Sequence, residues 1–125
     1  MPEKNILYVE DDFDNHTLVK LFLKNEPWNL IIAETPGQAH EALASQPMDL
    51  VIVDLNLQEE GDGATLIREL KKNPEYESIP VFVFSGFDEN HFSKYGLDDS
   101  IQRFFRKPTS KKMLIEAIRS IGDTK

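Results

Sequence analysis

Four short apolar runs divide the chain, and each is followed closely by polar or charged residues. The runs are Ile6-Leu7-Tyr8-Val9, Leu50-Val51-Ile52-Val53, Val81-Phe82-Val83-Phe84 and Phe104-Phe105. Unbroken apolar runs of this kind are typical of strands that are buried on both faces of a parallel sheet. Ligands of open α/β sheets gather beyond the carboxyl ends of such strands. The pattern therefore directs attention to the residues that follow the runs.

Apolar periodicity between the runs predicts helices, so strands and helices alternate along the chain. The expected strands cover residues 5–9, 28–33, 49–53, 80–84 and 102–105. The expected helices cover residues 15–25, a stretch that begins after Thr35, and residues 64–73, 88–96 and 110–121. Right-handed crossovers make a doubly wound five-stranded parallel sheet the natural arrangement of this order. We therefore predict a (βα)5 fold of the α/β class, with the first, third and fourth strands at its core.

The start of the second helix has a clear signature. Thr35 can be the N-cap, Pro36 the first helical residue, and Gln38 the return partner of a capping box. Asp12 is likewise expected to cap the first helix. By contrast, His16, His40 and His91 are spread over three predicted helices without the spacing of metal ligands, and they are expected at the surface.

Composition and charge exclude several classes of protein. The 125 residues include no Cys, which excludes a disulfide framework, a zinc–thiolate site and a thiol nucleophile. The formal charge of −8 argues against direct nucleic-acid binding, which needs a basic surface. No apolar stretch approaches the ~20 residues of a membrane span, and residues 1–5 lack the apolar core of a signal peptide. A cytoplasmic location with no membrane partner is therefore expected.

Acids, a hydroxyl and a lysine follow the predicted strands. Glu10 and Asp11 follow the first strand, Asp54 the third, Ser85 the fourth and Lys107 the fifth. The carboxyl ends of parallel strands meet at one edge of the sheet, so these groups should lie close together. Oxygen ligands suit hard divalent cations, and a lysine ammonium suits a phosphoryl oxygen. The set therefore suits the binding of a divalent metal and a phosphoryl group.

At these positions the chain resembles a response-regulator receiver domain, the phospho-accepting module of two-component signalling. The resemblance rests on residues 6–12, 49–57, 79–86 and the pair Lys107-Pro108, and it covers nearly the whole chain. It implies a flavodoxin-like receiver fold over residues 1–125 with no output domain. It also implies a signalling module, not an enzyme, that assists its own phosphorylation and dephosphorylation.

The resemblance assigns a metal site and a phosphoacceptor. Asp54 would accept the phosphoryl group. Glu10, Asp11 and Asp54 would hold Mg²⁺, together with the backbone carbonyl of Asn56. These assignments come from the family pattern and are expectations for this chain.

The resemblance also assigns the groups that respond to the phosphoryl group. Ser85 would meet it with a hydroxyl, Lys107 would bridge to Asp54, and the bond from Lys107 to Pro108 would be cis. Phe104, three residues before Lys107, would take the place of the aromatic switch residue. The donor would be a sensor histidine kinase or a histidine phosphotransfer protein, and the output would be binding to a downstream protein. A homodimer is left open.

The chain departs from the family pattern in three places. Gln58 stands where a proline is common, and Asp62-Gly63 comes about one residue later than usual. The segment 96–107 is longer than the common form. These departures affect the loop beside the acceptor and the surface of the fourth helix.

Other functions remain open at this point. A pseudo-receiver that binds partners without phosphorylation is the main alternative. A dehalogenase-type phosphatase would need a second Asp two residues after the nucleophile, where the chain has Asn56. A flavin carrier would need a phosphate-binding loop rich in Ser, Thr and Gly after the first strand, where the chain has acids.

Overall fold

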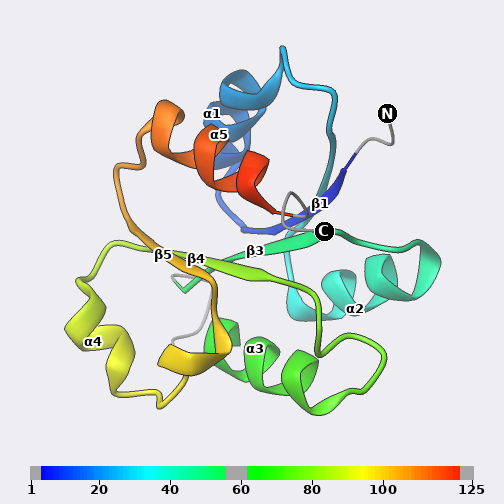
Figure 1. Cartoon of the computed structure of the whole chain (residues 1–125), viewed down its shortest axis with the longest axis vertical. Coiled ribbons are helices and arrows are strands. Elements are labelled where there is room, and N and C mark those ends of the chain that lie inside the picture. The colour runs from blue at the N-terminus through cyan, green and yellow to red at the C-terminus, as the bar shows by residue number, and fades with distance from the viewer. Residues whose placement is uncertain (1–3, 56–61, 122–125) are drawn as a thin grey trace.

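A computed structural model describes residues 4–55 and 62–121 of the chain (Figure 1). Its centre is a parallel sheet of five strands in the order β2-β1-β3-β4-β5. The strands are β1 (Asn5–Val9), β2 (Asn29–Ala33), β3 (Leu50–Asp54), β4 (Val81–Ser85) and β5 (Arg103–Arg106). The predicted doubly wound sheet is confirmed, and each strand lies within one residue of its predicted bounds.

Helices cover both faces of this sheet. They are α1 (Phe13–Leu23), α2 (Pro36–Ser45), α3 (Asp62–Lys72), α4 (Glu89–Ser93), the 3₁₀ helix η1 (Asp98–Ser100) and α5 (Lys111–Ser120). In Figure 1, α1 and α5 lie on one side of the sheet, and α2, α3 and α4 lie on the other. The N-cap of α2 is the predicted Thr35, whose Oγ1 accepts a hydrogen bond from the Gln38 amide at 3.1 Å. The Gln38 side chain returns to the Glu34 amide at 2.8 Å, one residue before the position expected for a capping box.

The core consists of two clusters, one on each face of the sheet. Alternate residues of a strand point to opposite faces, so Ile6 and Tyr8 pack beneath α1 and α5, while Leu7 and Val9 pack against α2 and α3. Every residue of β3 and of β4 is buried. The central strands are therefore enclosed on both sides, which fixes the positions of their carboxyl ends.

The candidate site residues lie where the strand order reverses. β1 pairs with both β2 and β3, so the crossovers turn in opposite directions on its two sides. The register places Val9 beside Val53, Asp54 beside Phe84, and Ser85 beside Arg106. The carboxyl ends of β1, β3, β4 and β5 consequently meet at one edge, which is the usual ligand site of such sheets.

Three helices differ from the sequence prediction by two residues or more, and the first of them, α1, begins at Phe13 and ends at Leu23 instead of covering residues 15–25. α3 begins at Asp62 and not at residue 64. Gly63 makes this possible, because a Cβ there would stand 3.0 Å from the Asp54 carbonyl oxygen and 3.2 Å from Leu55 Cα. α4 ends at Ser93 and not at residue 96, and Gly96 then turns the chain with a φ of 69°.

The shortness of α4 follows from its sequence. Phe92 is its only buried residue, so little apolar surface holds a longer helix against the sheet. The chain instead continues into η1, which the sequence did not predict. Ser93 Oγ joins the two segments by a hydrogen bond to Asp98 at 2.6 Å.

Candidate functional site

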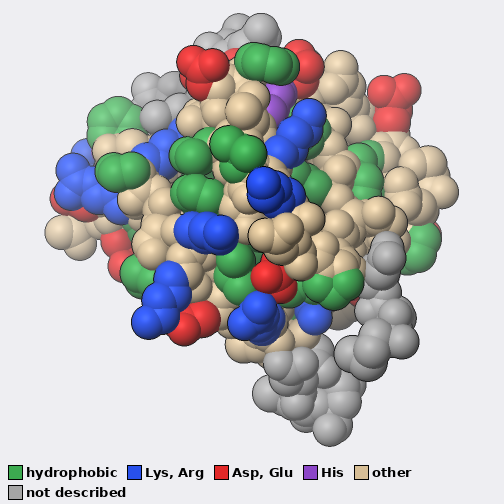
Figure 2. Space-filling model, turned by 90° about the horizontal axis from the view of Figure 1, so that it is seen from above, with side chains coloured by type: hydrophobic (Ala, Val, Ile, Leu, Met, Phe, Trp, Pro, Cys, Tyr) green, Lys and Arg blue, Asp and Glu red, His purple; other side chains and the backbone are tan. Residues whose placement is uncertain are grey.

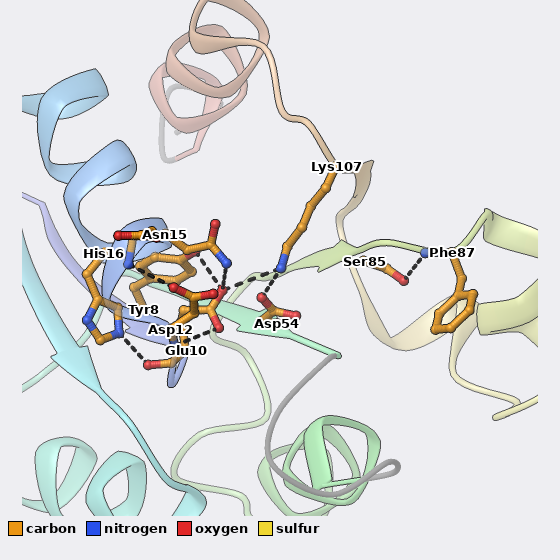
Figure 3. A network of polar contacts seen from close by, with 10 residues as sticks. Tyr8, Glu10, Asp12, Asn15, His16, Asp54, Ser85, Phe87 and Lys107 are labelled. Carbon is orange, nitrogen blue, oxygen red and sulfur yellow. Dashed lines mark hydrogen bonds and ion pairs between the residues drawn. The ribbon is translucent and has the colours of Figure 1, made fainter.

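Four polar side chains meet at the carboxyl edge of the sheet. Glu10 follows β1, Asp54 ends β3, Ser85 ends β4 and Lys107 follows β5. Glu10, Asp54 and Ser85 are almost completely shielded from solvent, with exposed fractions of 1%, 0% and 0%. Figure 3 shows Lys107 reaching from the end of β5 toward both carboxylates. The structure therefore brings Glu10, Asp54, Ser85 and Lys107 to one edge of the sheet, as the sequence predicts, whereas Asp11 is partly exposed.

Lys107 is the cation of this site. Its Nζ forms an ion pair with Asp54 Oδ2 and lies 3.5 Å from Glu10 Oε1. Burial by itself lowers the pKa of Lys107, but the hydrogen bond and charge of Asp54 outweigh it, so the pKa is raised. Lys107 therefore stays protonated. The bond from Lys107 to Pro108 is cis, as expected.

Glu10 is the second carboxylate of the site. Burial raises its pKa to about 8, and the hydrogen bond and charge of Asp54 act in the same direction. Lys107 and the Asp12 amide act the other way and only partly offset this. Near neutral pH Glu10 is therefore largely protonated, and Lys107 balances the charge of Asp54.

Three residues around Glu10 were not recognised from the sequence. Tyr8 Oη donates to Glu10 Oε1 at 3.3 Å, and Asn15 Nδ2 donates to the same oxygen at 2.9 Å. Burial and the charge of Glu10 raise the pKa of Tyr8, which keeps its hydroxyl a donor. His16 Nε2 contacts the Glu10 carbonyl oxygen.

The prediction that His16 lies at the surface is wrong. Its side chain is only 5% exposed, and it lies on the inner face of α1 with Val19 and Leu23. The spacing of these residues, three and then four apart, was the signal that could have identified a buried position. His40 does lie at the surface, where it pairs with Glu69 at 2.9 Å.

Ser85 is linked to two neighbouring loops. Its Oγ accepts a hydrogen bond from the Phe87 amide at 2.9 Å, and its carbonyl oxygen accepts one from the Lys107 amide at 2.8 Å. The hydroxyl proton is not used by the Phe87 contact, because the oxygen accepts there. Ser85 therefore retains a donor for an incoming oxygen.

Phe104 lies on the α3 and α4 side of β5. It is partly buried against that cluster, and its ring centroid is 5.7 Å from that of Phe92 in α4. The neighbouring Phe105 is buried on the opposite face, against Phe82 and Phe84. Phe104 is therefore a core aromatic, and its role as a switch stays a prediction.

The donor atoms at this edge fit a hard divalent cation. Mg²⁺ needs only one or two carboxylates, because waters and a phosphoryl group complete its shell. The buried pair of Glu10 and Asp54 supplies such carboxylates, and a cation would stabilise the ionised form of Glu10, which burial disfavours. In the described part of the chain, no group of three or more His, Cys, Asp or Glu side chains is placed to hold a metal ion.

The remaining predicted site residues have different outcomes. Asp12 caps α1, since its Oδ1 accepts from the Asp14 amide at 2.8 Å. Asp11 is partly exposed, and its role in binding metal stays a prediction. Asn56 and Gln58 lie outside the described residues.

Comparisons with known proteins identify relatives of the whole fold. Residues 6–119 match the family model of the response regulator receiver domain. The transcriptional regulatory protein KdpE of Staphylococcus aureus is 29% identical over 119 residues, which cover 95% of this chain and 50% of that protein. The sensor histidine kinase TmoS of Ectopseudomonas mendocina is 28% identical over 108 residues, covering 86% of this chain and 11% of that protein.

A solved structure shows the same architecture. The crystal structure of a sensor protein from Polaromonas sp. JS666 aligns with a TM-score of 0.88 and 27% identity, covering 98% of both chains. The chain spans about half or less of the length of the curated relatives it matches. None of the described helices is long and apolar enough to cross a membrane.

Proposed function

This chain belongs to the response regulator receiver domain family, and on that premise we propose that it accepts a phosphoryl group on Asp54. Members of the family are signalling modules of two-component systems that work with sensor histidine kinases. The proposed donor is a phosphohistidine on such a kinase or on a histidine phosphotransfer protein. The proposed output is a change in binding to a downstream protein.

The observation that carries this proposal is the buried ion pair of Asp54 and Lys107 beside Glu10. A carboxylate with 0% exposure at the end of a central strand is costly unless it is paired. Lys107 balances Asp54, whereas Glu10 has a pKa raised to about 8 and is held largely protonated in the metal-free pocket. A second buried acid beside Asp54 is explained if the pocket also receives a cation that favours its ionised form, as phosphoryl transfer to a carboxylate requires.

Mg²⁺ is the cation that we assign to this pocket. Glu10, Asp11 and Asp54 would hold it, with the backbone carbonyl of Asn56. When bound, the ion supplies positive charge that offsets the repulsion between a carboxylate and an anionic phosphoryl group.

The transfer step uses groups already in place. An Asp54 carboxylate oxygen attacks the phosphorus, the new P–O bond forms, and the P–N bond to the donor imidazole breaks. The imidazole keeps the electron pair of the broken bond. Lys107 moves from the carboxylate to a phosphoryl oxygen, and Ser85 donates its hydroxyl to another. Phosphoryl transfer depends mainly on positioning and charge, so these groups are sufficient.

The face formed by α1 and α5 lies next to this pocket and suits the donor protein. Figure 2 views this face and shows hydrophobic side chains gathered among Lys and Arg side chains. Leu18, Leu21 and Met113 are 41%, 54% and 51% exposed. A groove of about 270 Å³ runs between α1 and the loop after β5 and is lined in part by Leu18 and Lys107. An apolar helix face with acidic flanks would match this surface.

The test is the intact mass of the protein after incubation with acetyl phosphate, with and without Mg²⁺. We expect a Mg²⁺-dependent gain of one phosphoryl group in the parent and no gain in Asp54→Asn. Asp49→Asn is the matched control, because Asp49 precedes the opposite end of β3 and its carboxylate accepts a hydrogen bond from the Asn5 amide there. That control should gain the phosphoryl group like the parent.

The same assay addresses the pseudo-receiver alternative. If the parent gains no mass from acetyl phosphate, it is incubated with phosphorylated histidine kinases and phosphotransfer proteins. Failure with every donor would contradict the proposal and favour an interaction module that is never phosphorylated. A gain that persists in Asp54→Asn would place the acceptor at another residue.

A further inference from the structure

The carboxylate of Glu10 is held by an unequal set of donors. Oε1 accepts from Tyr8 Oη at 3.3 Å, from Asn15 Nδ2 at 2.9 Å and from Lys107 Nζ at 3.5 Å. Oε2 accepts from the Asp12 amide at 3.2 Å. A carboxylate offers about two acceptor positions on each oxygen. Oε1 is therefore fully engaged, whereas Oε2 has only the Asp12 amide among these donors.

The backbone of Glu10 is fixed as well. Its amide donates to the Ala33 carbonyl oxygen at 2.9 Å, and its own carbonyl oxygen contacts His16 Nε2. With the backbone fixed, the position of the carboxylate depends on the rotation of the Glu10 side chain. The contacts of Asn15 and Tyr8 with Oε1 fix that rotation.

Asn15 and Tyr8 reach Glu10 from two different elements. Asn15 lies in the first turn of α1, which begins next to Glu10 because Asp12 caps it. Tyr8 lies two residues before Glu10 in β1, on the same face of the sheet, and its ring packs against Phe84 at 5.7 Å. Figure 3 shows both side chains directed at the Glu10 carboxylate.

We propose that Asn15 and Tyr8 are positioning residues that occupy Glu10 Oε1 and so hold the carboxylate with Oε2 available to the cation. This inference rests on the proposed Mg²⁺ site. Donors that orient a metal-binding carboxylate set the affinity for the ion, because without them the ion must order the side chain itself. Asn15 makes the shorter of the two contacts and should contribute more.

The test measures metal binding directly, without phosphorylation. Mn²⁺ takes oxygen ligands like those of Mg²⁺, and the free ion can be counted by electron paramagnetic resonance. We expect Asn15→Ala to raise the Kd for Mn²⁺ about tenfold, the usual effect of losing an orienting partner. Tyr8→Phe keeps the ring and should raise the Kd about threefold, as expected for one longer hydrogen bond. Asn29→Ala is the matched control, because Asn29 bonds to Asn5 at the far end of β1 and should leave the Kd unchanged.

A double substitution separates positioning from general loosening of the fold. If Asn15 acts through Glu10, adding Asn15→Ala to Glu10→Ala should change the Kd by less than about twofold. Thermal unfolding of each variant without metal shows whether it is folded. If Asn15→Ala does not fold, the test is made with Tyr8→Phe.

The outcomes distinguish this inference from the proposed function. A parent that binds Mn²⁺ while both single variants bind it equally well would overturn the positioning role and leave the metal site standing. A parent that binds no Mn²⁺ would overturn both. A full loss of affinity from Asn15→Ala in the Glu10→Ala background would also overturn the inference, because the effect would not pass through Glu10.

Discussion

Replacing Glu10 with Gln should stabilise the metal-free protein at pH 8 and remove most of the pH dependence of its stability. The perturbation removes one negative charge from a side chain that is 1% exposed and keeps its shape. The amide oxygen of Gln can still accept hydrogen bonds from Tyr8 and Asn15. The substitution therefore tests the charge of the buried pair with little change in packing.

The magnitude follows from the pKa of Glu10. This pKa is raised from 4.5 to about 8 by burial first and then by the hydrogen bond and charge of Asp54. Between these values the folded state holds a proton that the unfolded state has released. The free energy of unfolding therefore falls as the pH rises from about 5 to about 8. At about 1.4 kcal/mol for each pH unit, the fall has an upper bound of about 5 kcal/mol.

The assay is urea denaturation in EDTA at several values between pH 5.5 and 8.5. The free energy of unfolding of Glu10→Gln should change less with pH than that of the parent. At pH 8 the variant should be more stable by on the order of 2–4 kcal/mol. The gain stays below the upper bound because the variant also loses the attraction between Glu10 and Lys107. Glu116→Gln, at an exposed position of α5, should follow the parent curve. Excess Mg²⁺ should raise the stability of the parent at pH 8 more than that of Glu10→Gln. Equal pH slopes for parent and variant in EDTA would refute the reasoning.

Two further predictions concern other parts of the site. Gly63→Ala should lower the free energy of unfolding by about 1–3 kcal/mol, because the added Cβ would stand 3.0 Å from the Asp54 carbonyl oxygen. Gly37→Ala is its control, because the added Cβ would have Thr35 Oγ1 as its nearest neighbour, at 3.8 Å. It should raise the free energy of unfolding by up to about 1 kcal/mol. Equal effects of the two substitutions in urea denaturation would contradict this account. Lys107→Met should slow phosphorylation by acetyl phosphate about a hundredfold, since it removes the cation paired with Asp54. Lys111→Met, at the exposed start of α5, is its control, and similar rates of mass gain in the two variants would exclude this role for Lys107.

The sheet and the carboxyl edge that holds the candidate site were predictable from the sequence. Both depend on the apolar run of each strand, which can be recognised one strand at a time. Leu50 to Val53 form an unbroken apolar run, and burial on both faces requires such a run in a parallel sheet. Once five strands are parallel, their carboxyl ends share one edge, so Asp54, Ser85 and Lys107 had to come close together. The cap of α2 was also predictable, because Thr35 and Pro36 act within one turn.

The surroundings of Glu10 were not predictable in the same way. The contact from Asn15 depends on where α1 begins and which way its first turn faces, and apolar periodicity does not specify either. The lack of metal-ligand spacing says nothing about burial, and His16 lies on the inner face of α1 with Val19 and Leu23. The start of α3 depends on the close approach of Gly63 to the Asp54 backbone. This is a contact between two separate elements, which the apolar periodicity of one helix does not reveal.

The arrangement also explains how a charge at Asp54 could reach a surface far from the pocket. A phosphoryl oxygen that draws the Ser85 hydroxyl toward Asp54 would lengthen the hydrogen bond that the Phe87 amide now donates to Ser85 Oγ. Phe87 stacks on His91 of α4, with ring centroids 4.3 Å apart. Phe104 contacts the same helix through Phe92 and precedes Lys107 by three residues. Both routes end on α4, which has only five residues and is held to the core by one buried side chain. Because a short helix with so little buried surface costs little to displace, α4 is where we expect the change of charge to become a change of shape.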